Sequence, residues 1–157
     1  MTQDTGPAAG RQLRPETILP FAMIGPDELL YLTDDLDHTV RKYTLDGKLL
    51  MTLGTSGQGS DTGVVDFDYR TMKQAGPPFH YPTNVAFGAD GSIYVSDGYG
   101  NARVHKFSAT GEHLFSWGEP GDGPGQFHLP HGIDLDSQGR VYVADRENCR
   151  VQIFTSE

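Results

Sequence analysis

The sequence has a single cysteine, Cys149, and few positive charges for its length. One cysteine cannot form an intrachain disulfide, so the fold must be stabilised without one. Lys and Arg total 12 against 21 Asp and Glu, which gives a formal net charge of −9. Because an acidic surface repels phosphate backbones, nucleic acid is excluded as the expected partner.

Long apolar runs are also missing. No segment approaches the ~20 apolar residues that cross a bilayer. Residues 1–17 are polar and lack the apolar stretch of a secretory signal. We therefore expect no membrane contact and a cytoplasmic location. Because 20 Gly and 10 Pro interrupt the chain often, long helices are disfavoured and an all-β class is indicated.

An internal repeat dominates what is present. Segment 79–107, FHYPTNVAFGADGSIYVSDGYGNARVHKF, aligns with segment 127–154, FHLPHGIDLDSQGRVYVADRENCRVQIF. Asp97 and Asp145 occupy the same position in the two copies, 145 − 97 = 48 residues apart. A fainter third copy, YLTDDLDHTVRKY, lies at 31–43. Repeats of this length are typical of propellers and other repeat architectures.

Each copy divides into short β-rich runs separated by turns that contain Asp, Thr and Gly. Four such strands in about 40–50 residues are typical of one propeller blade. In the first copy, apolar residues between Leu29 and Tyr43 have helical spacing, but the repeat alignment favours strands there. We predict strands at 30–33, 39–43, 84–87, 92–96, 103–107 and 113–117, and no helix longer than about two turns.

The repeat also predicts the organisation of the chain. Residues 1–26 are expected to be a polar N-terminal segment with a degraded first strand, followed by blades over the remainder, 27–157. The blades are placed at 27–54, 79–118 and 127–154, with residues 55–78 as an inserted surface loop rich in Gly, Asp and Thr.

Four strings resemble the lyase domain of peptide-amidating enzymes: YVSDGYGNARVHKF, WGEPGDGPGQF, LPHGIDLD and YVADRENCRVQIF. These peptidyl-α-hydroxyglycine α-amidating lyases (peptidylamidoglycolate lyases) are NHL-repeat β-propellers. The resemblance implies six blades around a zinc site with three His ligands, and cleavage of peptidyl-α-hydroxyglycine to a peptide amide and glyoxylate. The predicted fold is thus an all-β, incomplete propeller of about three four-stranded NHL-type blades.

Two family site residues carry over by motif. His131 in LPHGI matches a zinc ligand, and Tyr99 in SDGYGNARV matches the catalytic Tyr. We expect both at the same end of the strands and within roughly 15 Å of each other, since packed sheets are ~10 Å apart. Phe21 stands where the family has its first His, and the segments that would supply the third His and the catalytic Arg are absent. Weak zinc binding and little or no lyase activity are therefore expected of this chain alone.

Other recurring residues are interpreted as structural. Asp97 with Arg103, and Asp145 with Arg150, recur at one strand junction and are expected to tie the turn and bridge blades. The stretch Asp145–Asn148 is accordingly not assigned a catalytic role. We expect Trp117 and Phe127 to pack between blades, and His38, His105 and His113 to be solvated.

Two other functions are compatible with the repeat. One is a non-catalytic NHL-repeat module that binds peptide or protein on its loop-bearing face. The other is a calcium-dependent, lactonase-like propeller, which fits the LPHGI and SDGY strings poorly. Exposed blade faces and strand edges also predict self-association of the chain.

Overall fold

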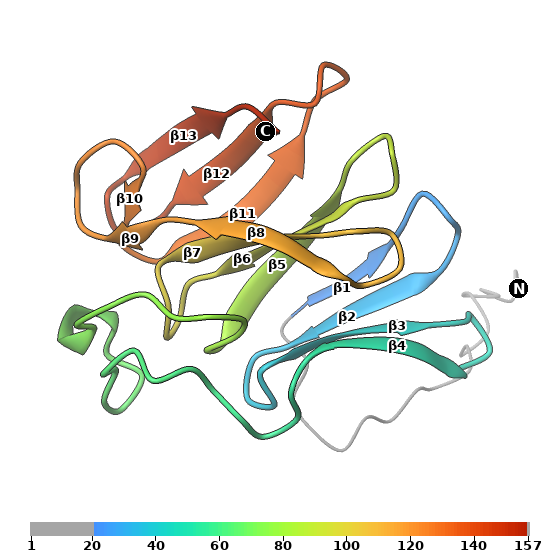
Figure 1. Cartoon of the computed structure of the whole chain (residues 1–157), viewed down its shortest axis with the longest axis horizontal. Helices are drawn as coiled ribbons and strands as arrows, with labels where there is room; N and C mark the ends of the chain where they lie inside the picture. The colour runs from blue at the N-terminus through green and yellow to red at the C-terminus, as the bar shows by residue number, and fades with distance from the viewer. Residues whose placement is uncertain (1–20, 157) are drawn as a thin grey trace, which may run out of the picture.

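A computed structural model describes residues 21–156 of the chain. They form three antiparallel sheets that fan out side by side, with the first strand of each sheet toward the middle of the molecule (Figure 1). The first sheet contains β1 Phe21–Ile24, β2 Leu30–Asp34, β3 Thr39–Tyr43 and β4 Leu49–Gly54. The second contains β5 Pro82–Phe87, β6 Ile93–Asp97, β7 Arg103–Phe107 and β8 His113–Trp117, and the third β11 Pro130–Leu135, β12 Val141–Asp145 and β13 Arg150–Phe154.

The up-and-down order of each sheet confirms the predicted all-β, blade-like fold. The predicted strands agree with the observed ones to within two residues at each end, and the helical spacing near Leu36 does not produce a helix. One difference concerns the first strand, which was expected to be degraded and outside the blade. Phe21–Ile24 forms it in full, pairing from Phe21↔Thr33 to Ile24↔Leu30.

Little regular structure exists outside the three sheets. A parallel pair, β9 Glu119–Pro120 and β10 Gln126–Phe127, closes the connection between the second and third sheets. The helical structure of the described residues is one short 3₁₀ turn, η1 Tyr69–Thr71. Within residues 21–156 there is therefore no helix long and apolar enough to cross a membrane.

The core consists of two clusters, one at each boundary between neighbouring sheets. Phe79 and Phe127, which occupy the same repeat position, are both fully buried, one in each cluster. Each ring lies against a glycine with positive φ, Gly54 (83°) or Gly118 (108°), where a Cβ would collide with it. The predicted packing of Phe127 and Trp117 between blades is confirmed.

A buried aspartate at the end of the second strand organises each sheet. Asp34, Asp97 and Asp145 are all fully buried. In the third sheet the Asp145 carboxylate accepts hydrogen bonds from the backbone N–H of His128 and from the side chains of Asn148 and Arg150. The prediction that Asp145 ties the turn is thus confirmed, and Arg150 joins Asp145 to the loop before β11.

For Asp97 and Arg103 only the first part of the prediction holds: the carboxylate ties the turn, whereas Arg103 Nε makes no hydrogen bond among the described residues. Asp97 accepts from the backbone N–H of His80, from Asn101 Nδ2 at 2.8 Å and from His105 Nε2 at 3.1 Å. His105, expected to be solvated, is fully buried. His105 is the third residue of β7, and its imidazole takes part in holding the Asp97 carboxylate.

The insertion at 55–78, drawn in green in Figure 1, is anchored to the second sheet. Thr62 is fully buried and donates to the carbonyl of Gly100 at 2.6 Å. Asn101 exchanges two hydrogen bonds with the backbone of Gly76, at 3.1 and 3.2 Å. Both ends of the insertion are therefore held against the loop that connects β6 and β7.

Candidate functional site

Tyr99 and His131 form a hydrogen-bonded pair at the boundary between the second and third sheets. Tyr99 lies in the loop after β6, and His131 is the second residue of β11. The Tyr99 hydroxyl is 2.8 Å from His131 Nε2, and the two rings meet edge to face with centroids 5.4 Å apart. The prediction that the two residues lie close together at one end of the strands is confirmed. Their chemical roles stay predictions.

Buried hydroxyl groups attach the strand that carries His131 to the second sheet. Thr83 Oγ1 on β5 donates to the Pro130 carbonyl at 2.8 Å, and Ser96 Oγ on β6 donates to the His131 carbonyl at 3.0 Å. Both hydroxyl residues are fully buried. The backbone around His131 is thus attached directly to the sheet that carries Tyr99.

Gly98 permits the close approach of these two sheets, and we expect Gly98→Ala to separate Tyr99 from His131. A Cβ at Gly98 would overlap the carbonyl group of Pro130. Relieving such overpacking costs about 1–3 kcal/mol of unfolding free energy, which chemical denaturation would measure. Gly132→Ala is the matched control, because its new Cβ would lie 3.5 Å from the Ala144 Cβ, an ordinary contact. Equal stability of the two variants would contradict the prediction.

The surroundings keep both members of the pair neutral. Burial raises the pKa of the Tyr99 hydroxyl, and the Asp35 carboxylate raises it further, while Arg146 acts in the opposite direction. Burial lowers the pKa of His131, and Arg146 lowers it further. A protonated phenol beside a neutral imidazole makes Tyr99 the donor and His131 Nε2 the acceptor.

Phe21 also contacts the ring of His131. It is the first residue of β1, and its ring meets the His131 ring edge to face with centroids 5.7 Å apart. The position where the family has its first zinc ligand therefore does reach His131, but it carries a benzene ring. In the part of the chain that the structure describes, no three His, Cys, Asp or Glu side chains are grouped to hold a metal ion. These residues do not fit a zinc site by themselves, which takes three protein ligands.

Sequence reasoning missed two charged residues of this site, Arg146 and Asp35. Both directly follow the buried aspartate of their repeat, at the position of Gly98 in the second copy. Asp145 and Asn148 are structural as expected, but Arg146 is exposed and acts electrostatically on both Tyr99 and His131. The sequence did carry a signal for these residues, because the position after the repeated aspartate holds a different residue in every copy.

Sequence comparison shows what the chain is similar to. The NHL repeat family model matches residues 79–107 and 127–154. Human NHL repeat-containing protein 3 is 39% identical over 76% of the chain, and rat peptidylglycine α-amidating monooxygenase is 37% identical over 88%. Peptidyl-α-hydroxyglycine α-amidating lyase 1 of Drosophila melanogaster is 34% identical over 85%. The chain spans 32%, 14% and 24% of these three proteins, respectively.

Solved structures share the fold. A Bacteroides thetaiotaomicron protein of unknown function superimposes with a TM-score of 0.59 at 19% identity, over 82% of this chain and 32% of that one. Virginiamycin B lyase from Staphylococcus aureus gives 0.53 at 15% identity, over 85% and 40%. These identities support a common architecture only. The chain therefore contains two NHL repeats, and its sequence is similar to the peptidyl-α-hydroxyglycine amidating lyases and to NHL repeat-containing protein 3.

Proposed function

We propose that this chain forms part of the active-site wall of a peptidyl-α-hydroxyglycine lyase and does not complete the reaction on its own. The observation that supports the proposal is the Tyr99–His131 hydrogen bond of 2.8 Å at a sheet boundary, with the exposed Arg146 beside it. A substrate of this class carries a hydroxyl group and a carboxylate on one carbon. Arg146 supplies a guanidinium for the carboxylate, and Tyr99 a phenol for the hydroxyl.

The reaction requires loss of the hydroxyl proton as the C–N bond breaks, with a proton delivered to the departing amide nitrogen. Tyr99 would accept the first proton only as a phenolate, which its raised pKa disfavours at neutral pH. Zinc, where the lyases of this family hold it, supplies the positive charge that makes a phenolate accessible. Beside Tyr99 the described residues provide one imidazole, that of His131, which is one of the three protein ligands that a catalytic zinc site takes.

Glyoxylate release tests the proposal directly. We expect an α-hydroxyglycine peptide to bind the chain through Arg146. Arg146→Gln should therefore weaken the affinity for this peptide about threefold or more, the scale of one exposed charge pair. We expect no glyoxylate above the uncatalysed rate, with or without added zinc, and no change in Tyr99→Phe or His131→Ala. Zinc-dependent turnover that both substitutions abolish would show that the chain assembles a working site.

The similarity to NHL repeat-containing protein 3 favours one alternative, a non-catalytic module that binds peptide or protein on this face. A module of this kind has no need to distinguish the hydroxyglycine end of a peptide from its amide. Equal binding of the two peptides, unchanged in Arg146→Gln, would support the module and contradict the lyase proposal.

A further inference from the structure

Arg103 does not make the contacts that the equivalent arginine makes in the third sheet. Its counterpart in the third sheet, Arg150, donates through Nε to Asp145 at 2.8 Å. The remaining guanidinium N–H groups of Arg150 reach three backbone carbonyls in the loop before β11, those of Asp122, Gly123 and Gln126. Arg103 begins β7 as Arg150 begins β13, yet its Nε is buried with no hydrogen-bond partner among the described residues.

Loop length explains the difference. Asn148 holds the Gly121 carbonyl as Asn101 holds that of Gly76, so the two glycines are equivalent anchors. From the anchor to the buried phenylalanine is 127 − 121 = 6 residues in the third repeat, but 79 − 76 = 3 in the second. The shorter loop lacks the carbonyls that would receive a guanidinium, and the side-chain donors to the Asp97 carboxylate are Asn101 and His105.

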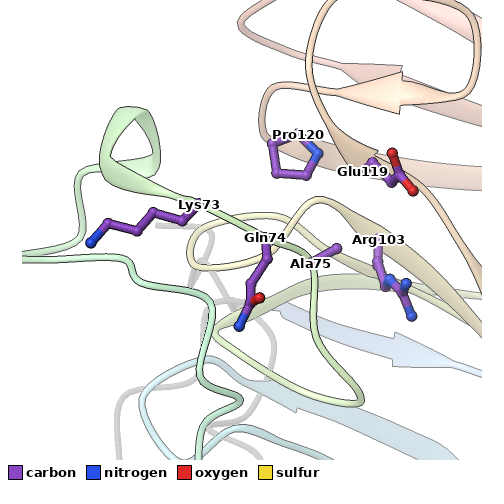
Figure 2. Close-up of a pocket in the computed structure, with 6 residues that line it drawn as sticks. All are labelled: Lys73, Gln74, Ala75, Arg103, Glu119 and Pro120. Carbon is purple, nitrogen blue, oxygen red and sulfur yellow. The ribbon is translucent and has the colours of Figure 1, made fainter.

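The space left by the short loop is a pocket of about 330 Å³. It is lined by Lys73, Gln74 and Ala75 of the insertion, by Arg103, and by Glu119 and Pro120 of β9. In Figure 2, Glu119 and Pro120 lie above Arg103, Gln74 and Ala75, and the Lys73 side chain extends outward at the rim. Arg103, whose Nε is buried without a partner among the described residues, thus lines an open pocket that has a second cation at its edge.

We propose that this pocket binds a carboxylate of a peptide, with Arg103 as the anchor. A guanidinium presents parallel N–H groups that match the two oxygens of a carboxylate, and an unsatisfied buried donor gains most from such a partner. The Gln74 amide can donate a further hydrogen bond, and Pro120 offers an apolar surface to the adjoining residue. A single negative charge suits the site better than a phosphate, because Glu119 lies in the wall and the chain carries a net charge of −9. The proposal does not depend on the lyase assignment.

Titration of the ¹⁵N-labelled full chain with acetyl-trialanine, compared with its C-terminal amide, tests this pocket. We expect the Arg103 Nε–H signal and the backbone amides of Gln74 and Ala75 to shift saturably with the carboxylate and not with the amide. Arg103→Gln should weaken the binding about tenfold or more, the scale of a charge-assisted hydrogen bond. Glu119→Gln should strengthen it up to about fivefold, since it removes one nearby like charge.

Two control variants identify the guanidinium responsible. Arg140→Gln removes an exposed guanidinium that pairs with Asp136 at a distant turn, and Arg146→Gln removes the cation near Tyr99. Neither should alter the shifts at Gln74 and Ala75. Shifts of equal size with the amide peptide, or shifts that persist in Arg103→Gln, would overturn the proposal. Tighter binding of inorganic phosphate than of the peptide at equal ionic strength would overturn its assignment to a carboxylate.

Discussion

Asp97→Ala is expected to lower the free energy of unfolding by about 3–5 kcal/mol, the cost of removing one partner from a buried charged network. The carboxylate is fully buried and receives the backbone N–H of His80, the Asn101 amide and His105 Nε2. Alanine would leave the His80 N–H and His105 Nε2 without this acceptor, and would leave Asn101 Nδ2 only its bond to the Gly76 carbonyl. Urea denaturation followed by circular dichroism measures the loss, as a lower midpoint with an unchanged slope.

Asp134→Ala is the matched control for this substitution. Asp134 is exposed on β11, and its carboxylate accepts a hydrogen bond from the adjoining backbone N–H of Leu135 at 2.8 Å. We expect it to change stability by no more than about 0.5 kcal/mol. A loss below about 1 kcal/mol in Asp97→Ala would mean that water or side-chain rearrangement satisfies the orphaned donors.

Phe21→His is expected to raise the affinity of the chain for zinc by at least about tenfold, or 1.4 kcal/mol. The ring at position 21 already lies 5.7 Å from the His131 ring, centroid to centroid. A second imidazole there would share a metal ion with His131, and zinc favours several nitrogen ligands acting together. Competition with a chromophoric zinc chelator at pH 7.5 would measure the change, since both imidazoles are neutral above their ordinary pKa of about 6.5.

Two further variants separate coordination from packing. Phe21→Leu alters the packing without adding a ligand, so it should leave zinc affinity unchanged. Adding His131→Ala to Phe21→His should return the affinity to that of the unmodified chain. If Phe21→His binds zinc no better than Phe21→Leu, the two side chains do not converge on one metal position.

Much of the fold could be predicted from the sequence because each blade repeats the same pattern of strand and turn residues. Turn residues, alternating strands and a terminal aspartate recur at equivalent positions in the copies. Alignment of the copies therefore predicted strands on both sides of Leu36, where the spacing of apolar residues alone would have predicted a helix. Phe127 was expected to pack between blades, and both it and its equivalent Phe79 lie in the core. The resemblance likewise paired Tyr99 with His131, because loops at equivalent strand ends meet at one boundary.

Contacts between segments of unequal length could not be predicted in this way. The partners of Asp97, the burial of His105 and the isolation of Arg103 depend on a connection three residues shorter than its counterpart, 6 − 3 = 3. A repeat alignment assigns equivalent residues equivalent partners, whereas a hydrogen bond forms only where the loop brings an acceptor within reach. The repeat in the sequence thus determined the blades, and the family resemblance identified Tyr99 and His131, while the tertiary structure alone decided that Arg103 Nε stayed unpaired, because that depends on the distance a connecting loop can span.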